Sequence, residues 1–269
     1  MMLFRTKKRL EKETGDMAEL ALKKSHGSDA WGRLLRNRLG MVGAVIVVVI
    51  VLLVVFAEVF TWYDYADQNM VNRFQLPNRE HIMGTDNLGR DIWSRLVFGG
   101  RISLMVSIMA VAISGVAGAI LGSVSGYFGG TTDLFITRIL DIIMSIPSML
   151  LAIAISASLG SGPSKTALAI SISSIPHGAR IIRSTVMAVK GSDFVEAAKA
   201  TGSRPARIIS RHILPNTIAP LIVNVTLNIG GSIMAISGLS FIGLGVQPPY
   251  RNGVPFWQPA AHIYAISGL

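Results

Sequence analysis

The sequence predicts an all-α polytopic membrane protein, and two observations support this fold class. Hydrophobic residues make up 51% of the 269 residues, charged residues only 15%, and the mean hydropathy is +0.52. Soluble domains are charged at about 25% of their residues. Long uncharged runs also alternate with short polar segments, as helices that cross a bilayer require. Because cysteine is absent, the sequence offers no disulfide framework, zinc cluster or thiol nucleophile.

A basic arm opens the chain and precedes the first apolar run. Residues 1–39 hold ten Lys and Arg side chains, and we expect an interfacial helix near Trp31. Residues 40–60 contain one charged side chain, Glu58, and are long enough for the first transmembrane helix. The basic excess before this helix predicts a cytoplasmic amino terminus. We interpret the net charge of +10 as membrane orientation, because the basic residues form no aromatic-interleaved patch for nucleic acid.

The segment 61–101 is polar, and its five basic residues balance its five acidic ones, which suits the outer face of a membrane. His81, Asp86 and Asp91 lie within it and could be read as metal ligands. Three mixed ligands at loop spacing are weak grounds for a metal site. We therefore expect no metal there.

Residues 102–269 are predicted to form the transmembrane core. We expect further spans at 102–127, 134–159, 166–189 and 214–244. Gly118, Gly122 and Gly126 repeat every four residues and predict that another helix approaches this backbone closely. Pro147 predicts a kink in the third span.

Polar residues inside these spans allow more than one interpretation. Arg138 and Asp141 have the i, i+3 spacing of a mutual ion pair, which we favour over substrate binding. His177 is either a proton relay or, as we favour, a packed or water-facing side chain beside a proline. Asn224 and Asn228 share a helix face, where they form interhelical hydrogen bonds or a wet pore wall.

The polar segment 190–215 lies between apolar runs and predicts two short helices joined by a bend. Asp193 and Glu196 have the spacing of a capping box at the start of the first helix. Gly202 suits the left-handed turn that ends this helix, and we expect the second helix to run to Pro215. Four crossings separate this segment from the basic arm, so both are expected in the cytoplasm.

Each of the two short helices presents a face that suits a partner. On the first helix the face is mostly small and permits close approach, and on the second it is basic and suits an acidic partner or lipid headgroups. The small face comprises Phe194, Ala197, Ala198 and Thr201, and the basic stripe comprises Arg204, Arg207 and Arg211. A solvated loop between two spans is the alternative, and the pattern alone gives it equal weight.

Three motifs resemble those of one family of membrane proteins. Glu196-Ala197-Ala198, then Gly202, then His212-Ile213-Leu214-Pro215 resembles the EAA loop of ABC importer permeases, with His212 where an aliphatic residue is usual. A second set resembles the H-x-x-G-T-D-x-x-G-R-D signature of dipeptide, oligopeptide and nickel permeases, and it comprises His81, Gly84, Thr85, Asp86, Gly89, Arg90 and Asp91. Residues Gly238–Pro249 resemble the G-L-S-F-L-G-L-G-x-Q-P-P segment of the same family.

The resemblance implies the fold of a type I ABC importer permease, with the polar segment as the loop that couples it to an ATPase. The residues expected to act in coupling are Asp193, Glu196, Ala197, Ala198, Gly202, Arg204, Arg207, Arg211, Leu214 and Pro215. His177, Asn224 and Asn228 are the candidates for the translocation path. The family has a sixth span, whereas five are visible here, because the fourteen residues from Phe256 are too few to cross a bilayer.

The implied function is import of peptides, driven by ATP hydrolysis on partner subunits, with no catalysis and no cofactor expected of this chain. The implied partners are a second homologous permease chain, two cytoplasmic ATP-binding subunits, an extracytoplasmic substrate-binding protein and the bilayer of a prokaryotic inner membrane. Nickel chelates or another small solute are alternative cargoes. A passive channel would leave the coupling loop unexplained, and a membrane hydrolase using His81, Asp86, Asp91 or His177 lacks the G-x-S-x-G and H-E-x-x-H patterns.

Overall fold

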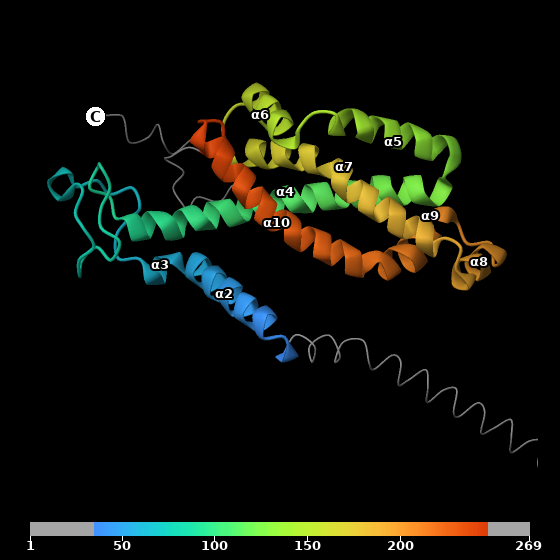
Figure 1. Ribbon diagram of the computed structural model, residues 1–269, viewed down its shortest axis with the longest axis horizontal. Coiled ribbons are helices and arrows are strands. Elements are labelled where there is room, and N and C mark those ends of the chain that lie inside the picture. The colour runs from blue at the N-terminus through green and yellow to red at the C-terminus, as the bar shows by residue number, and fades with distance from the viewer. Residues whose placement is uncertain (1–34, 247–269) are drawn as a thin grey trace, which may run out of the picture. The chain divides into compact units, whose positions relative to one another are not determined.

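The computed structural model describes residues 35–246, and the regular elements within them are all helices (Figure 1). The longer ones are α2 (Arg38–Val55), α4 (Ile92–Phe128), α5 (Gly130–Met144), α6 (Ser148–Leu159), α7 (Pro163–Val189), α8 (Asp193–Ala200) and α10 (Ile218–Phe241). The all-α class is therefore confirmed. The expected interfacial helix, the Gln247–Pro249 end of the third motif and the carboxyl-terminal tail lie outside the described residues.

The chain divides into two units between Phe60 and Thr61. In the first unit, the Asn37 side chain caps α2 by accepting a hydrogen bond from the Gly40 amide at 3.2 Å. The 18 residues of α2 are apolar almost all round. The helix ends at Val55 because Phe56 leaves helical geometry, and the short helix α3 (Ala57–Phe60) follows. The first span is thus interrupted near its end, whereas the sequence predicts one unbroken helix over residues 40–60.

The second unit begins with an irregular segment that leads into α4. This helix has 37 residues and starts at Ile92, whereas the sequence predicted a start at residue 102. The difference arises because the Asp91 carboxylate accepts a hydrogen bond from the Ser94 amide at 2.7 Å and caps the helix there. The polar residues that follow Asp91 are therefore the first turns of a long helix.

By length and apolarity, the described chain contains three helices able to cross a membrane, or four if the bent pair α5 and α6 counts as one. The pair turns by 84° between Met144 and Ser148, so the kink predicted at Pro147 is confirmed but a single straight span is wrong. Pro147 has no backbone N–H group, so it cannot donate the hydrogen bond that would continue α5. A new helix, α6, begins after it. The predicted fourth span, α7, has 27 residues but is not among these helices, because Ser, His and Arg residues interrupt its apolar sequence.

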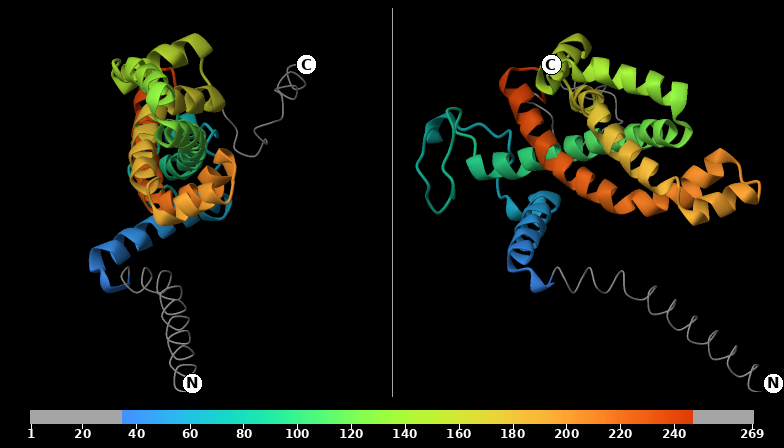
Figure 2. Two further views of the ribbon diagram at one scale, coloured as in Figure 1. Left: turned by 90° about the vertical axis from the view of Figure 1, so that its right-hand side faces the viewer. Right: turned by 45° about the vertical axis from the view of Figure 1, so that its right-hand side comes forward.

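The tightest helix contact in the second unit joins α4 to α7 (Figure 2). A methyl group added at Gly118 would lie 3.0 Å from the Ala179 amide nitrogen, and one at Gly126 would lie 2.9 Å from the Arg183 carbonyl oxygen. At Gly122 a methyl group would collide with the Ala179 carbonyl oxygen. The predicted small-residue seam is therefore confirmed, and its partner is α7.

Two apolar clusters lie at opposite ends of this helix pair. One joins α4, α6, α7 and α10 through residues that include Val106, Ile170 and Leu239. The other joins the ends of α4 and α7 to the segment that follows, through Tyr127, Ile182, Val186, Val195, Ala198, Ile208 and Ile213. The second cluster positions the candidate site.

Two ion pairs hold α5 against α7. The Arg183 guanidinium donates two hydrogen bonds of 2.6 Å to the Asp133 carboxylate, which also accepts from the Ser125 hydroxyl. Arg180 donates to Asp141 at 2.8 Å. The predicted pair between Arg138 and Asp141 is therefore wrong, because Asp141 finds its partner on the neighbouring helix.

The segment before α4 is held by buried polar contacts among the signature residues. The Thr85 hydroxyl accepts from the Gln75 amide at 2.8 Å and donates to the Asn72 carbonyl oxygen. Gly84 and Gly89 have φ of +75° and +72°, and a side chain at either would collide with a backbone carbonyl oxygen. These glycines therefore permit the close crossings of the chain that the segment contains.

Asp86 is the acceptor at the centre of this segment. Burial opposes its ionisation, but the Arg90 and Leu88 amides and the Arg90 guanidinium hydrogen-bond its carboxylate, and together they hold the pKa of Asp86 below its ordinary value of 3.8. Arg95 also donates to it. The depressed pKa means that ionised Asp86 stabilises the folded segment.

We predict that Gly122→Ala lowers the thermal stability of the chain in detergent, by about 1–3 kcal/mol, because the methyl group has no space against α7. The matched control is Gly115→Ala on the same helix, where the nearest atom to the added methyl lies at 3.9 Å. That variant should be neutral or more stable, since alanine favours helix by about 1 kcal/mol over glycine. Equal effects of the two substitutions on the unfolding temperature would contradict the seam.

We predict that stability of the segment before α4 falls as pH drops through the lowered pKa of Asp86. A depressed carboxyl pKa contributes stability above the ordinary value of 3.8, and this contribution is lost below the folded-state pKa. Asp86→Asn should therefore be less stable at neutral pH and should show less loss on acidification. Limited proteolysis between residues 61 and 91, across a pH window of about 2 to 6, measures this loss. Identical pH profiles for the two proteins would refute the prediction.

Candidate functional site

The candidate site is the polar segment that follows α7, and it begins with α8. The N-cap residue of this helix is Ser192, whose carbonyl oxygen accepts from the Val195 and Glu196 amides at 2.9 and 3.2 Å. Its hydroxyl donates backwards to the Val189 carbonyl oxygen at 2.8 Å, so the helix has no side-chain cap. The predicted capping box between Asp193 and Glu196 is therefore wrong. Both carboxylates lie in the first turn, where the positive end of the helix dipole stabilises their negative charge.

The predicted bend at Gly202 is confirmed. Gly202 has φ of +75°, its amide donates to the Lys199 carbonyl oxygen at 2.9 Å, and the Ser203 amide donates to the Ala198 carbonyl oxygen at 3.1 Å. These two bonds form a Schellman motif, which satisfies carbonyl groups at the helix end. The short helix α9 (Pro205–Ile208) then starts with proline in its first turn, as predicted.

The second helix of the segment does not stop at Pro215, contrary to the prediction. A π-helical turn (Ile209–Ile213) and a 3₁₀ turn (Leu214–Thr217) carry the chain without a break into α10. Pro215 has no backbone N–H group, and the wider π-helical turn accommodates this. The Leu214 amide donates to the Ile209 carbonyl oxygen, and the Asn216 side chain donates to the His212 carbonyl oxygen at 2.6 Å. The segment is therefore continuous with α10.

The segment rests on the ends of α4 and α7 through a buried apolar cluster. Val195 and Ile213 are completely buried, and Ile208 is almost so, against Tyr127 and α7. The ammonium groups of Lys190 and Lys199 each lie 6.0 Å from the centre of the Tyr127 ring, at the limit of a cation–π contact. Tyr127 therefore links α4 to α8, a role that its position in an uncharged span gave no sign of.

The surface of α8 that remains exposed is broader than the predicted small face. Phe194, Ala197 and Thr201 are exposed, as that face requires, but Ala198 is buried in the apolar cluster and supports the helix from beneath. Asp193, Glu196 and Gly202 are exposed as well. The helix therefore presents an apolar and acidic surface at the end of the α4–α7 pair.

The basic stripe also lies on the surface. Arg204, Arg207 and Arg211 are all exposed, and Leu214 and Pro215 continue the path towards α10. Together with α8, the segment offers both signs of charge within about twenty residues, which suits a protein partner with its own charge pattern.

The outer signature residues are brought together, but they form a structural network. His81 Nδ1 lies 2.9 Å from the Asp91 Oδ1 atom, both side chains are buried, and Tyr63 packs on the His81 ring at 4.6 Å between centres. Asp86 binds Arg90 and Arg95 instead. Across residues 35–246, no group of three His, Cys, Asp or Glu side chains could hold a metal ion.

The residues predicted for a translocation path lie on two helices. Asn228 donates to the Asn224 side-chain oxygen at 2.8 Å, so the two amides bond along α10 rather than across helices. The Asn224 oxygen also faces Gly178 on α7. His177 is exposed on α7.

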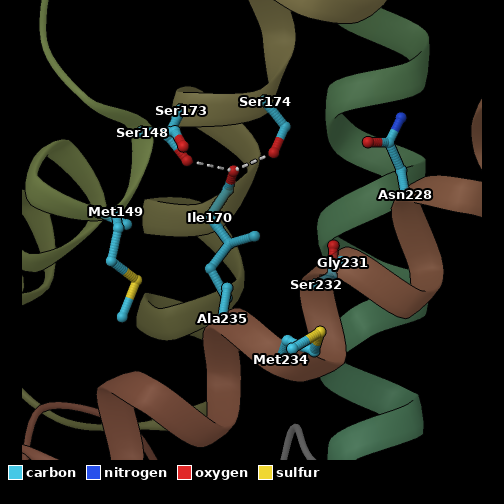
Figure 3. A pocket seen from close by; sticks show the side chains of 11 residues that line it. Ser148, Met149, Ile170, Ser173, Ser174, Asn228, Gly231, Ser232, Met234 and Ala235 are labelled. Atoms are coloured by element: carbon cyan, nitrogen blue, oxygen red, sulfur yellow. Dashed lines mark hydrogen bonds between the residues drawn. The ribbon is translucent and has the colours of Figure 1, made fainter.

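A cavity of about 380 Å³ opens between α6, α7 and α10, and Asn228 lines it (Figure 3). The sequence reasoning selected Asn228 but missed the other wall residues, of which four are serines: Ser148, Ser173, Ser174 and Ser232. They come from three helices, so no local pattern could have grouped them. His177 and Asn224 do not line this cavity.

Comparison with known proteins identifies the family. Residues 118–256 match the family described as "Binding-protein-dependent transport system inner membrane component", and residues 25–77 match the "N-terminal TM domain of oligopeptide transport permease C". The first match contains the candidate segment and the cavity.

Individual relatives align over most of their length. A dipeptide transport system permease protein, DppC, from Alkalihalophilus pseudofirmus is 43% identical over 229 residues, which cover 85% of this chain and 74% of that protein. The oligopeptide transport system permease protein OppC of Bacillus subtilis is 37% identical over 239 residues, covering 88% and 78%. The glutathione transport system permease protein GsiD of Escherichia coli O6:K15:H31 is 38% identical over 222 residues, covering 81% and 73%.

A solved structure with a related chain is the MetNI methionine ABC transporter in inward facing conformations, with 17% identity and a TM-score of 0.47 over 54% of this chain and 73% of that one. The family matches and the identities above 30% over most of each chain decide the assignment. The chain belongs to the binding-protein-dependent transport system inner membrane components, as an ABC importer permease of the dipeptide and oligopeptide group.

Proposed function

We propose that this chain is one of two permease subunits of an ATP-driven importer that carries peptides across the inner membrane. Its polar segment from α8 to Pro215 would receive the motion of two ATP-binding subunits in the cytoplasm. An extracytoplasmic substrate-binding protein would deliver the cargo to the opposite side. The chain itself would bind no nucleotide and catalyse no reaction.

One observation carries this proposal: α8 is exposed on one side and fixed to the ends of α4 and α7 on the other. A solvated loop would not need completely buried anchors such as Val195 and Ile213. An exposed helix on a rigid base is the geometry expected of a contact that transmits force. The segment is therefore better explained as a docking element than as a passive connection.

The proposed mechanism follows the contacts outward from α8. A partner that pushes on α8 displaces Tyr127 and with it the end of α4, because α8 and Tyr127 share one packed cluster. The glycine seam obliges α7 to move with α4, since the two backbones touch. Because the helical chain is continuous from α9 into α10, the same motion would also shift α10, which forms the third wall of the cavity.

We infer from the charge distribution that this segment lies in the cytoplasm. The basic arm at 1–39 and the basic residues from Arg180 to Arg211 both carry the charge expected of the cytoplasmic side. If the basic arm and α8 lay on the outer side instead, the signature segment, with its balanced charge, would face the cytoplasm. We therefore assign the amino terminus and α8 to the cytoplasm and residues 61–91 to the outer side.

Peptides are the proposed cargo because the relatives are named as dipeptide, oligopeptide and glutathione transport permeases. Nickel chelates and other small solutes remain alternative cargoes for the same architecture. The direct test is uptake of labelled peptides into vesicles that contain the complete assembly. ATP-dependent uptake would support the proposal, and ATP-independent flux would instead support a passive channel.

We predict that Gly202→Asp uncouples ATP hydrolysis from uptake. An aspartate at φ of +75° strains the bend by about 1–2 kcal/mol and moves α8 relative to its base. Uptake per ATP hydrolysed should fall about tenfold or more, while membrane insertion and the ATPase activity of the partner subunits persist. Both quantities are measured in the same reconstituted vesicles.

Gly191→Asp is the matched control for this variant. Gly191 lies in the same segment, has open space around it and does not have a left-handed backbone, so the same charge is added without strain. We expect its coupling ratio to match that of the unsubstituted assembly. Equal coupling in both variants would show that the bend at Gly202 has no role in transmission.

A further inference from the structure

The cavity between α6, α7 and α10 has a wall chemistry that selects for a particular class of ligand group. Its volume of about 380 Å³ lies in the range of small-ligand sites. None of the eleven described residues that line it is ionisable. A ligand group that enters must therefore be neutral or keep its charge in water, because an unpaired charge is costly to bury.

Three polar side chains of the wall, Ser173, Ser174 and Asn228, each carry an oxygen that can accept a hydrogen bond from a ligand. The hydroxyls of Ser173 and Ser174 both donate to the Ile170 carbonyl oxygen at 2.9 Å, so their hydrogens are used and their lone pairs remain (Figure 3). The Asn228 side-chain nitrogen donates one of its two N–H groups to Asn224, and its side-chain oxygen can accept a hydrogen bond. In Figure 3 that oxygen is turned towards Ser174.

The remaining wall is soft and small. Met149 and Met234 are flexible side chains that adapt to different shapes, and Gly231 leaves open space where a side chain would project. Such a surface excludes few ligand side chains by shape. Discrimination therefore falls to the acceptors of α7 and α10.

From these contacts we propose that the cavity binds the neutral N–H groups of a peptide backbone, through the oxygens of Asn228, Ser173 and Ser174. The inference rests on the proposed peptide import and adds its chemical basis at this site. Backbone amides are shared by all peptides, so the site recognises the class without reading side chains. A solute without N–H donors would leave the three acceptors unsatisfied, which lowers its occupancy.

The experiment compares a neutral-side-chain tripeptide with the same tripeptide methylated on its backbone nitrogens. Uptake is measured in vesicles with the full assembly, at concentrations that saturate the substrate-binding protein with each peptide. We expect the unsubstituted assembly to take up the methylated peptide about fivefold more slowly for each hydrogen bond lost. Asn228→Leu should slow uptake of the unmethylated peptide by a similar factor and reduce the ratio between the peptides.

Two further variants keep the result interpretable. Ser174→Ala removes one acceptor with little change in volume and should reduce the same ratio even where Asn228→Leu assembles poorly. Thr226→Val is the control, because the Thr226 hydroxyl bonds to its own helix at the Ile222 carbonyl oxygen and lies outside the cavity. It should leave the ratio unchanged.

The outcomes separate this inference from the proposed function. Uptake of both peptides at equal rates, or a ratio that neither Asn228→Leu nor Ser174→Ala changes, would overturn the acceptor site while leaving peptide import intact. Absence of ATP-dependent uptake of either peptide would overturn peptide import and the inference together. A ratio that falls in both variants and persists in Thr226→Val would support the site.

Discussion

The close approach of α4 and α7 is the constraint on which the rest of the second unit depends. Gly118, Gly122 and Gly126 let the two backbones touch along several turns, so neither helix can slide or tilt without the other. In a bilayer, where lipid competes equally for apolar surface, such contact is a main source of helix association. The ion pairs from α7 to α5 then fix a third helix to the same pair, with Asp133 satisfied by three groups.

The two ends of this helix pair carry the two features of interest. At one end Tyr127 and its neighbours hold α8, and towards the other end α7 supplies one wall of the cavity. Because α9 continues through a π-helical turn into α10, the opposite wall is connected to the same segment. A single displacement of α8 therefore reaches both walls, by rigid packing on one side and by helix continuity on the other. This arrangement would provide the physical route that the proposed coupling requires.

The features that the sequence predicted well depend on local backbone chemistry. Gly202 and Pro205 determine the bend after α8, and Pro147 determines the kink between α5 and α6. The glycine repeat on α4 predicts a close contact with another helix. The features that it missed depend on partners far along the chain. Arg183 pairs with Asp133 across fifty positions, Ser192 rather than Asp193 occupies the N-cap position of α8, and serines from separate helices converge on the cavity. Periodicity gives the face of a helix but not the identity of the helix that covers it.

The central claim is that α8 and the end of α7 move as one body during transport. The absence of cysteine allows spin labels to be placed through Ala200→Cys and Met187→Cys, both at exposed positions and outside the residues assigned to docking. Pulsed electron paramagnetic resonance on the assembled transporter would report the distance between the labels with and without ATP. We predict one narrow distribution of distances that ATP does not change. Adding Tyr127→Ala should broaden it, whereas Ile120→Ala, at an exposed position on the same helix, should leave it intact. A distance that shifts with ATP when Tyr127 is present would contradict the claim.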